Sequence, residues 1–218
     1  MNRLYNALQL KRLYQLKQLG FQYVPIIEKR TGAPSTLPND LKALEQIVSQ
    51  CHLCPLSKTR TKTVFGEGNP HAKLMFVGEG PGAQEDTTGR PFVGRAGELL
   101  TKMIENVLEI PRSEVYIANI VKCRPPNNRV PTPEEAYTCL PYLHKQIELI
   151  QPNVIAALGA TAYHYMTGEK TGITKVRGEI YEMGTFKLIP TYHPSYLLRN
   201  PSAKKEAYQD LLKIKGML

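Results

Sequence analysis

Three polar segments of the sequence combine residue types that could act on a bound ligand. The first, GEGPGAQED at residues 78–86, places three carboxylates in a glycine-rich turn. The second begins at Asn119 and continues into KCRPPNNR, and the third, TYHPSYLLRN, contains His193. Carboxylates, a carboxamide and an imidazole suit acid–base chemistry, amide recognition and hydrogen-bond donation to a leaving group.

The glycine-rich segment allows several interpretations. Its start matches the dinucleotide pattern G-x-G-x-x-A, but Pro81 stiffens the turn, and the helix that must follow such a loop is not expected here. We therefore predict an active-site loop that brings the backbone close to a ligand. A purely structural turn stays open, as does a divalent-metal site formed by the three acids of the segment, Glu79, Glu85 and Asp86.

The four cysteines form a C-x2-C pair and a C-x15-C pair, separated by 68 residues. The N-terminal residues lack the apolar core of a secretory signal, so a disulfide framework is not expected. A zinc ribbon normally uses two compact C-x2-C pairs, whereas a cubane cluster accepts thiolates from all sides. The spacing leaves an iron–sulfur cluster, a zinc site and unrelated buried thiols open. The cysteines are Cys51, Cys54, Cys123 and Cys139.

The segment around His193 has two interpretations. A histidine in front of a proline can simply cap a turn. However, Leu197 and Leu198 next to Arg199 combine an apolar wedge with a phosphate-binding charge, which is the pairing used to insert a side chain between base steps.

These segments follow short apolar runs that predict strands of a parallel sheet. The runs cover 74–77, 115–121, 154–158 and 186–189, and helices are expected between them at 96–107, 132–149 and 160–166, with a last helix at 202–215. Alternation of strands and helices predicts a three-layer α/β/α fold with a central, mainly parallel four-stranded sheet. In such a sheet, chemistry gathers at the carboxyl ends of the strands.

Charge and composition indicate the kind of partner and the segments of the chain. Lysine and arginine number 28 against 19 acids in 218 residues, a formal charge of +9 that favours a polyanionic partner. No apolar run approaches the roughly 20 residues needed to cross a bilayer. We predict a basic helical extension at 1–31, a linker at 32–40, and a catalytic domain at 41–218 whose first helix is capped by Asp40. The extension could dock on the domain, bind nucleic acid or a partner, or target an organelle.

The order of these motifs resembles the family 4 uracil-DNA glycosylases, which carry a [4Fe-4S] cluster. The resemblance spans about residues 41–213 and rests on GEGPGAQED, TGRPFVGRAGELL, NIVKCRPPNNR with the downstream Cys139, and HPSYLLRN. A related branch that traps its product covalently carries a basic insertion after the second strand. This chain has CRPPNNRVPTPEE there, so ordinary turnover is expected.

The resemblance implies roles for the residues of the pocket. Phe92 would stack on the uracil ring and Asn119 would read its N3–O4 edge, with Gly80 close to the base. His193 would donate to uracil O2 as negative charge develops there. Glu79 is expected near the attacking water and Glu85 at the ring edge.

The resemblance also implies DNA contacts and a cofactor. The expected DNA-binding residues are Pro81, Arg124, Arg129, Pro194, Ser195, Leu197, Leu198 and Arg199, although plain solvent exposure stays open for Arg124 and Arg129. The four cysteines would hold a structural [4Fe-4S] cluster. We expect a cytoplasmic monomer, nucleoid-associated in a prokaryote, that acts on single- or double-stranded uracil-containing DNA without a membrane or a nucleotide cofactor. A non-catalytic DNA-binding or polymerase-associated module, and a nucleotide-dependent enzyme, are the competing interpretations.

Overall fold

A computed structural model describes residues 37–218 of the chain. The residues from 37 onward form one compact unit. The helical extension expected at 1–31 and the first part of the expected linker, 32–36, lie outside the described residues. In the described part, no helix is both long enough and apolar enough to span a bilayer.

The centre of this unit is a sheet with the strand order β1-β3-β2-β4-β6-β5. The inner four strands are parallel to one another, and β1 and β5 pair antiparallel at the two edges. The α/β fold class is confirmed, but the described sheet has six strands rather than the expected four. The two edge strands were not predicted, because each is only two residues long and has no apolar run. The strands are β1 (Glu67–Gly68), β2 (Leu74–Gly78), β3 (Tyr116–Asn119), β4 (Val154–Leu158), β5 (Tyr181–Glu182) and β6 (Lys187–Thr191).

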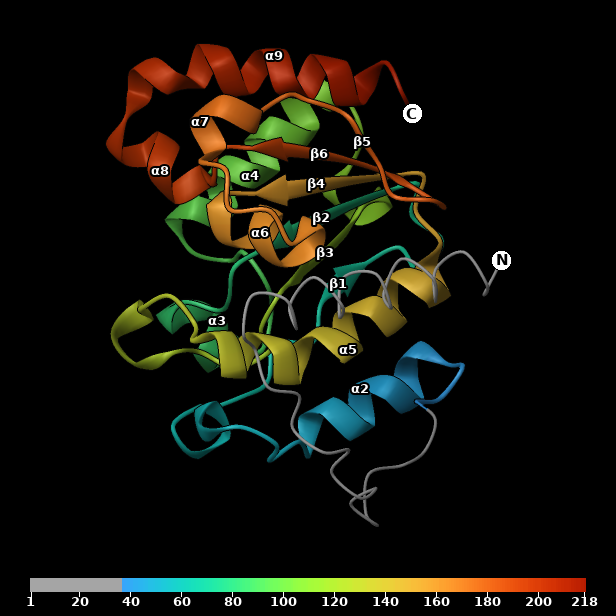
Figure 1. The fold of residues 1–218 in the computed structure, drawn as a ribbon, viewed down its shortest axis with the longest axis vertical. Coiled ribbons are helices and arrows are strands. Elements are labelled where there is room, and N and C mark those ends of the chain that lie inside the picture. The colour runs from blue at the N-terminus through green and yellow to red at the C-terminus, as the bar shows by residue number, and fades with distance from the viewer. Residues whose placement is uncertain (1–36) are drawn as a thin grey trace, which may run out of the picture. The chain divides into compact units, whose positions relative to one another are not determined.

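Eight α-helices of the described residues surround this sheet (Figure 1). Local capping begins two of them, because Asp40 Oδ2 accepts from the Ala43 N–H at 2.8 Å and Thr132 Oγ1 accepts from the Glu135 N–H at 3.3 Å. The helices are α2 (Leu41–Ser49), α3 (Ala83–Thr88), α4 (Arg95–Met103), α5 (Pro133–Ile150), α6 (Ala160–Thr167), α7 (Ile173–Val176), α8 (Pro194–Arg199) and α9 (Lys204–Lys215).

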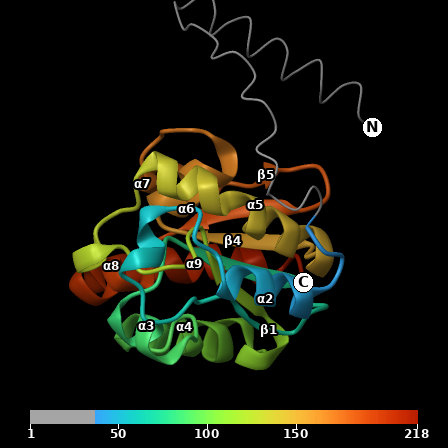
Figure 2. The same cartoon turned by 90° about the horizontal axis from the view of Figure 1, so that it is seen from below.

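Alternating strand residues build one core on each face of the sheet. In β2, Met75 and Val77 pack with α2, α5 and α6, whereas Leu74 and Phe76 pack with α4 and α9. Figure 2 shows α5 and α6 on one side of the sheet and α4 on the other. Because both faces are covered, the inner strands are apolar throughout, as expected for a parallel sheet.

Two segments expected to be loops contain short helices. The six-residue α3 follows the glycine-rich turn directly, with Gly82 as its N-cap, so the expectation that no helix follows this turn was wrong. The other is α8, which begins at Pro194 and has His193 as its N-cap. The consequence concerns Leu197, which is only 1% exposed in the core beneath α8. The prediction that Leu197 serves as a wedge is therefore wrong, because its side chain packs inward.

Candidate active site

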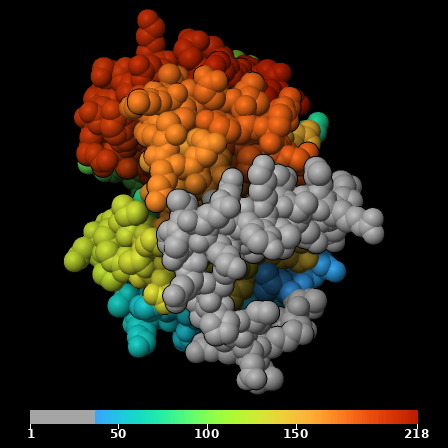
Figure 3. All heavy atoms as spheres, viewed as in Figure 1, coloured from blue at the N-terminus to red at the C-terminus, as the bar shows by residue number. Residues whose placement is uncertain are grey.

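Each of the four parallel strands ends at the same edge of the sheet with a residue that lines one cavity. Glu79 follows β2, Asn119 ends β3, Gly159 follows β4, and His193 lies two residues beyond β6. The cavity measures about 560 Å³, which is a usual size for a small-molecule site. The segment leading into α5 and the start of α6 contribute to its wall and lie together on the face shown in Figure 3.

Phe92 and Asn119 approach each other over Gly78. A Cβ atom at Gly78 would lie 2.5 Å from Asn119 Oδ1 and 2.6 Å from Phe92 Cζ, so only glycine leaves room for both. The backbone of Phe92 has a φ of 52°, which non-glycine residues rarely adopt. A Cβ at Gly97 would lie 1.9 Å from the Phe92 carbonyl oxygen, so α4 packs directly against this bend.

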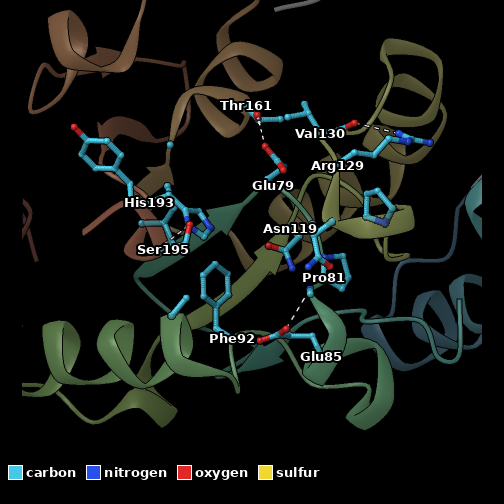
Figure 4. Close-up of a pocket in the computed structure, with 18 of the residues that line it drawn as sticks. Glu79, Pro81, Glu85, Phe92, Asn119, Arg129, Val130, Thr161, His193 and Ser195 are labelled. Carbon is cyan, nitrogen blue, oxygen red and sulfur yellow. Dashed lines mark hydrogen bonds between the residues drawn. The ribbon is translucent and has the colours of Figure 1, made fainter. Parts of the chain in front are cut away.

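The carboxamide of Asn119 has an unused acceptor. Asn119 is 1% exposed, and its Oδ1 is the buried side-chain polar atom of the described residues that has no hydrogen-bond partner. A buried acceptor without a partner costs free energy unless a ligand supplies the donor. Figure 4 shows this side chain facing the space between Phe92, Glu79 and His193.

His193 acts as a helix cap through one nitrogen and leaves the other available. Its Nδ1 accepts from the Ser195 backbone N–H at 3.1 Å, so the ring hydrogen belongs on Nε2. Burial lowers the pKa of His193 to about 4, and the charge of Arg199 acts in the same direction. The imidazole is therefore neutral at pH 7. Its ring lies 5.6 Å from that of Phe92, at 34°.

The carboxylate of Glu79 is held by a residue that the sequence reasoning missed. Thr161 Oγ1 donates to Glu79 Oε2 at 2.5 Å (Figure 4). The other oxygen, Oε1, accepts no hydrogen bond from residues 37–218. The signal for Thr161 was present in the sequence, because this residue follows the predicted strand 154–158 at the same edge of the sheet.

Glu85 has its hydrogen-bonding capacity occupied by the backbone. Its Oε1 accepts from the N–H groups of Val93 and Gly94 at 3.0 and 3.1 Å, and its Oε2 accepts from the Gly82 N–H at 3.1 Å. The carboxylate thus joins the glycine-rich turn to the residues directly after Phe92. Glu85 still lines the cavity, but these contacts favour positioning the pocket over acting on a ligand.

Among the remaining predicted residues, some line the cavity and others do not. The cavity lining includes Gly80, Pro81, Arg129, Ser195 and Arg199. Arg124, Pro194, Leu197 and Leu198 are not part of its lining, although Leu198 is 36% exposed. The lining also contains residues that were not predicted, among them Val130 and Tyr196.

The two arginines of the second segment differ in their contacts. Arg129 forms a two-point ion pair with Glu135 at 2.7 and 2.8 Å, and its side chain stays 42% exposed. Arg124 donates from Nε to Asn128 Oδ1 at 2.8 Å. Arg129 therefore borders the cavity with a fixed guanidinium.

The four cysteines are free thiols that line a second, smaller pocket. Three sulfur atoms receive hydrogen bonds: Cys123 from Arg60 Nη1 at 3.2 Å, Cys139 from the Lys122 N–H at 3.3 Å, and Cys51 from the Tyr142 hydroxyl at 3.5 Å. Such donors suit sulfur that carries negative charge.

The thiols line this pocket without converging on one point. Among residues 37–218, no three His, Cys, Asp or Glu side chains are grouped closely enough to hold a metal ion. The three acids of the glycine-rich segment form no such group either. Sulfur donors from three separate parts of the chain thus line one pocket.

Comparisons with known proteins agree with this geometry. A family model described as the uracil DNA glycosylase superfamily matches residues 65–212. A type-4 uracil-DNA glycosylase of Thermotoga maritima is 52% identical over 182 residues, which cover 82% of this chain and 94% of that protein. A type-4 uracil-DNA glycosylase of Sulfurisphaera tokodaii is 46% identical over 188 residues, which cover 82% of this chain and 85% of that protein. A DNA polymerase of Bacillus phage SP01 is 34% identical over 72% of this chain but only 17% of its own length.

Proposed function

The chain belongs to the uracil DNA glycosylase superfamily and excises uracil from DNA in DNA repair, and we propose that it does so by enclosing one flipped-out base between Phe92, Asn119 and His193. The observation that carries this proposal is the unpartnered Asn119 Oδ1, buried in a cavity that the other two side chains also line. A competing binding-only module would have no use for a buried acceptor opposite a hydrogen-bond donor.

Asn119 would select the base. Uracil presents an N3 donor next to an O4 acceptor, and the carboxamide offers the complementary oxygen and NH2 group. Cytosine reverses this pattern and would leave two buried groups unpaired, which is a strong basis for discrimination. Phe92 would supply the stacking surface, because Glu85 and Gly97 fix its backbone beside the cavity.

His193 would stabilise the leaving group. Cleavage of the N-glycosidic bond places negative charge on the departing uracil, chiefly at O2, and positive charge on the sugar. A neutral imidazole that bears its hydrogen on Nε2 can donate to O2 without losing a proton. The donation strengthens as charge develops, so it favours the transition state over the substrate.

Glu79 would orient the attacking water and stabilise the cationic sugar. Thr161 occupies Oε2, which leaves Oε1 to accept from a water molecule on the sugar side of the base. Hydrolysis would then release free uracil and leave an abasic site, without a covalent enzyme intermediate. This division of roles makes Glu85 a positioning residue rather than the residue at the ring edge.

The rim of the cavity would bind the strand. Pro81, Ser195, Arg129 and Arg199 line it, and the two arginines suit phosphate contacts. With Leu197 in the core, the exposed Leu198 is the remaining leucine for the wedge that offsets the unstacking of the base.

The four cysteines would hold an iron–sulfur cluster, as the resemblance to the family 4 uracil-DNA glycosylases implies. The residues present fit such a group, because the sulfurs receive three hydrogen bonds, one of them from the cationic side chain of Arg60. When bound, the cluster would tie the end of α2 to the segment after Asn119 and to α5. Anaerobically purified protein should contain iron and sulfide and absorb visible light, and chelatable zinc without such absorbance would contradict this assignment.

The excision itself is tested with a uracil-containing oligonucleotide, purified protein and no added metal or nucleotide. We expect alkali-labile sites at the uracil position and none in an oligonucleotide that carries thymine there. Intact strands after alkali in both cases would contradict the proposed function.

A further inference from the structure

A column of flat groups leads from the core to the rim of the cavity. The guanidinium carbon of Arg177 lies 5.6 Å from the ring centre of Tyr192. The Tyr192 ring in turn lies 4.9 Å from the Tyr196 ring, with 29° between their planes. Arg177, Tyr192 and Tyr196 therefore form a contiguous series of flat groups in contact.

The inner end of this column is fixed. Arg177 Nε donates to Asp210 Oδ2 at 3.0 Å, and Nη2 donates to the other oxygen of the same carboxylate. Asp210 is 1% exposed and also accepts from Thr191 Oγ1 at 2.7 Å. Tyr192 is 5% exposed. Neither Arg177 nor Tyr192 is part of the cavity lining, so the reaction described above does not account for the column.

The outer end of the column is open. Tyr196 is 36% exposed and lines the cavity together with Arg199, which is three residues further along α8. One face of its ring is covered by Tyr192. One face of such an aromatic ring packs on a neighbouring ring, and the ring is exposed beside a cationic side chain. It therefore provides a stacking surface for a nucleobase whose phosphate is bound nearby.

We propose that Tyr196 is a stacking platform for the nucleobase next to the uracil in the same strand. This inference rests on the proposed function, because a strand whose uracil occupies the cavity must continue past the rim. Its occupant is a base of any identity, since every base offers a π face. The fixed column means that little side-chain freedom is lost on binding.

The test combines protein variants with modified substrates. Tyr196→Leu removes the ring, Tyr196→Phe retains it, and Tyr208→Leu is the matched control, because Tyr208 is an exposed tyrosine of α9 outside the cavity lining. Each protein is assayed on a single-stranded oligonucleotide with ordinary bases beside the uracil. Two further oligonucleotides have a tetrahydrofuran residue, which lacks a base, on the 5′ or the 3′ side of the uracil.

We expect Tyr196→Leu to lower kcat/KM on the ordinary oligonucleotide about 5- to 100-fold, the range of base–aromatic stacking. On one of the two tetrahydrofuran substrates, the kcat/KM of the same variant should differ from that of the unmodified protein by less than about twofold. That substrate would also show whether the stacked base lies on the 5′ or the 3′ side of the uracil. Tyr208→Leu should retain full kcat/KM on the ordinary substrate, and Tyr196→Phe, which keeps the ring, should lose much less than Tyr196→Leu.

An equal loss on all three substrates, or no loss with Tyr196→Leu, would overturn the proposal. Fluorescence-anisotropy binding of the same oligonucleotides in a Glu79→Ala background, where excision is slowed, gives the same comparison for affinity. A failure of the platform therefore leaves uracil excision intact, whereas a failure of the proposed function abolishes excision with the unmodified protein.

Discussion

Glu85 holds the bend at Phe92 through backbone N–H groups, since its Oε1 accepts from Val93 and Gly94, the two residues that follow the ring. Phe92 itself has a φ of 52°, a conformation that costs about 1 kcal/mol or more for a residue with a side chain. The third contact, to the Gly82 N–H, joins this bend to the start of α3. The shape of the pocket floor thus depends on one carboxylate that has no spare oxygen.

Glu85→Ala should therefore loosen the pocket and weaken the fold. We expect a loss of about 2 kcal/mol in the free energy of unfolding, because three N–H groups lose their partner, together with a higher KM for the uracil oligonucleotide. Denaturant unfolding and steady-state kinetics measure the two effects. Glu98→Gln, at an exposed acid of the neighbouring α4, is the control. Unchanged stability and KM in the Glu85 variant would contradict the positioning role.

Thr161 should act through Glu79. Thr161→Val removes the donor to Oε2 at nearly constant volume and should lower kcat about 5- to 10-fold, with KM little changed. Thr161→Ser keeps the hydroxyl and should retain most of the rate. In a Glu79→Ala background, Thr161→Val should add less than about a twofold loss. If the two losses multiply instead, Thr161 does not work by holding this carboxylate.

Asn119 should determine which base is removed. Asn119→Asp replaces the NH2 group that pairs with O4, so uracil excision should fall about 100-fold or more, and any new activity should be toward cytosine. Excision rates on matched uracil and cytosine oligonucleotides measure the change, with Asn119→Ala as the control that should lose uracil activity without gaining cytosine activity. Retained selectivity for uracil in the Asp variant would refute the reading role.

The neutral state of His193 has a pH signature. Because burial lowers its pKa to about 4, the folded protein takes up this proton only near that pH, whereas the unfolded chain does so near 6.5. The unfolded state therefore binds more protons between pH 4 and 6.5, and the contribution of His193 to stability is complete above 6.5 and is lost as the pH falls toward 4. NMR of 15N-labelled histidine should show an Nε2–H tautomer from pH 5 to 8, assigned by loss of the signal in His193→Gln. A protonated ring at pH 6 would contradict this.

Features with a local physical cause could be predicted from the sequence. The apolar run at β4 coincides with the strand, and Asp40 caps α2, because buried strands and helix caps are defined by neighbouring residues. The edge strands β1 and β5 could not be predicted, since two residues carry no periodicity and pair only where the neighbouring strand is already in place.

The site residues also divide into those that could be predicted from the sequence and those that could not. The strand ends placed Glu79, Asn119 and His193 at one edge of the sheet, but the partners that hold them come from elsewhere in the fold. The bond from Thr161 to Glu79 and the three contacts of Glu85 join segments whose approach depends on the assembled sheet. Leu197 was expected at the surface, but α8 buries it. This helix has too few residues to show an apolar stripe in the sequence.

The most direct measurement is a crystal structure of the protein with uracil bound in the cavity. We expect the ring to stack on Phe92, N3 to donate to Asn119 Oδ1, O4 to accept from the Asn119 NH2 group, and O2 to lie within hydrogen-bond distance of His193 Nε2. Uracil bound elsewhere, or bound in this cavity with Asn119 Oδ1 still lacking a partner, would contradict it.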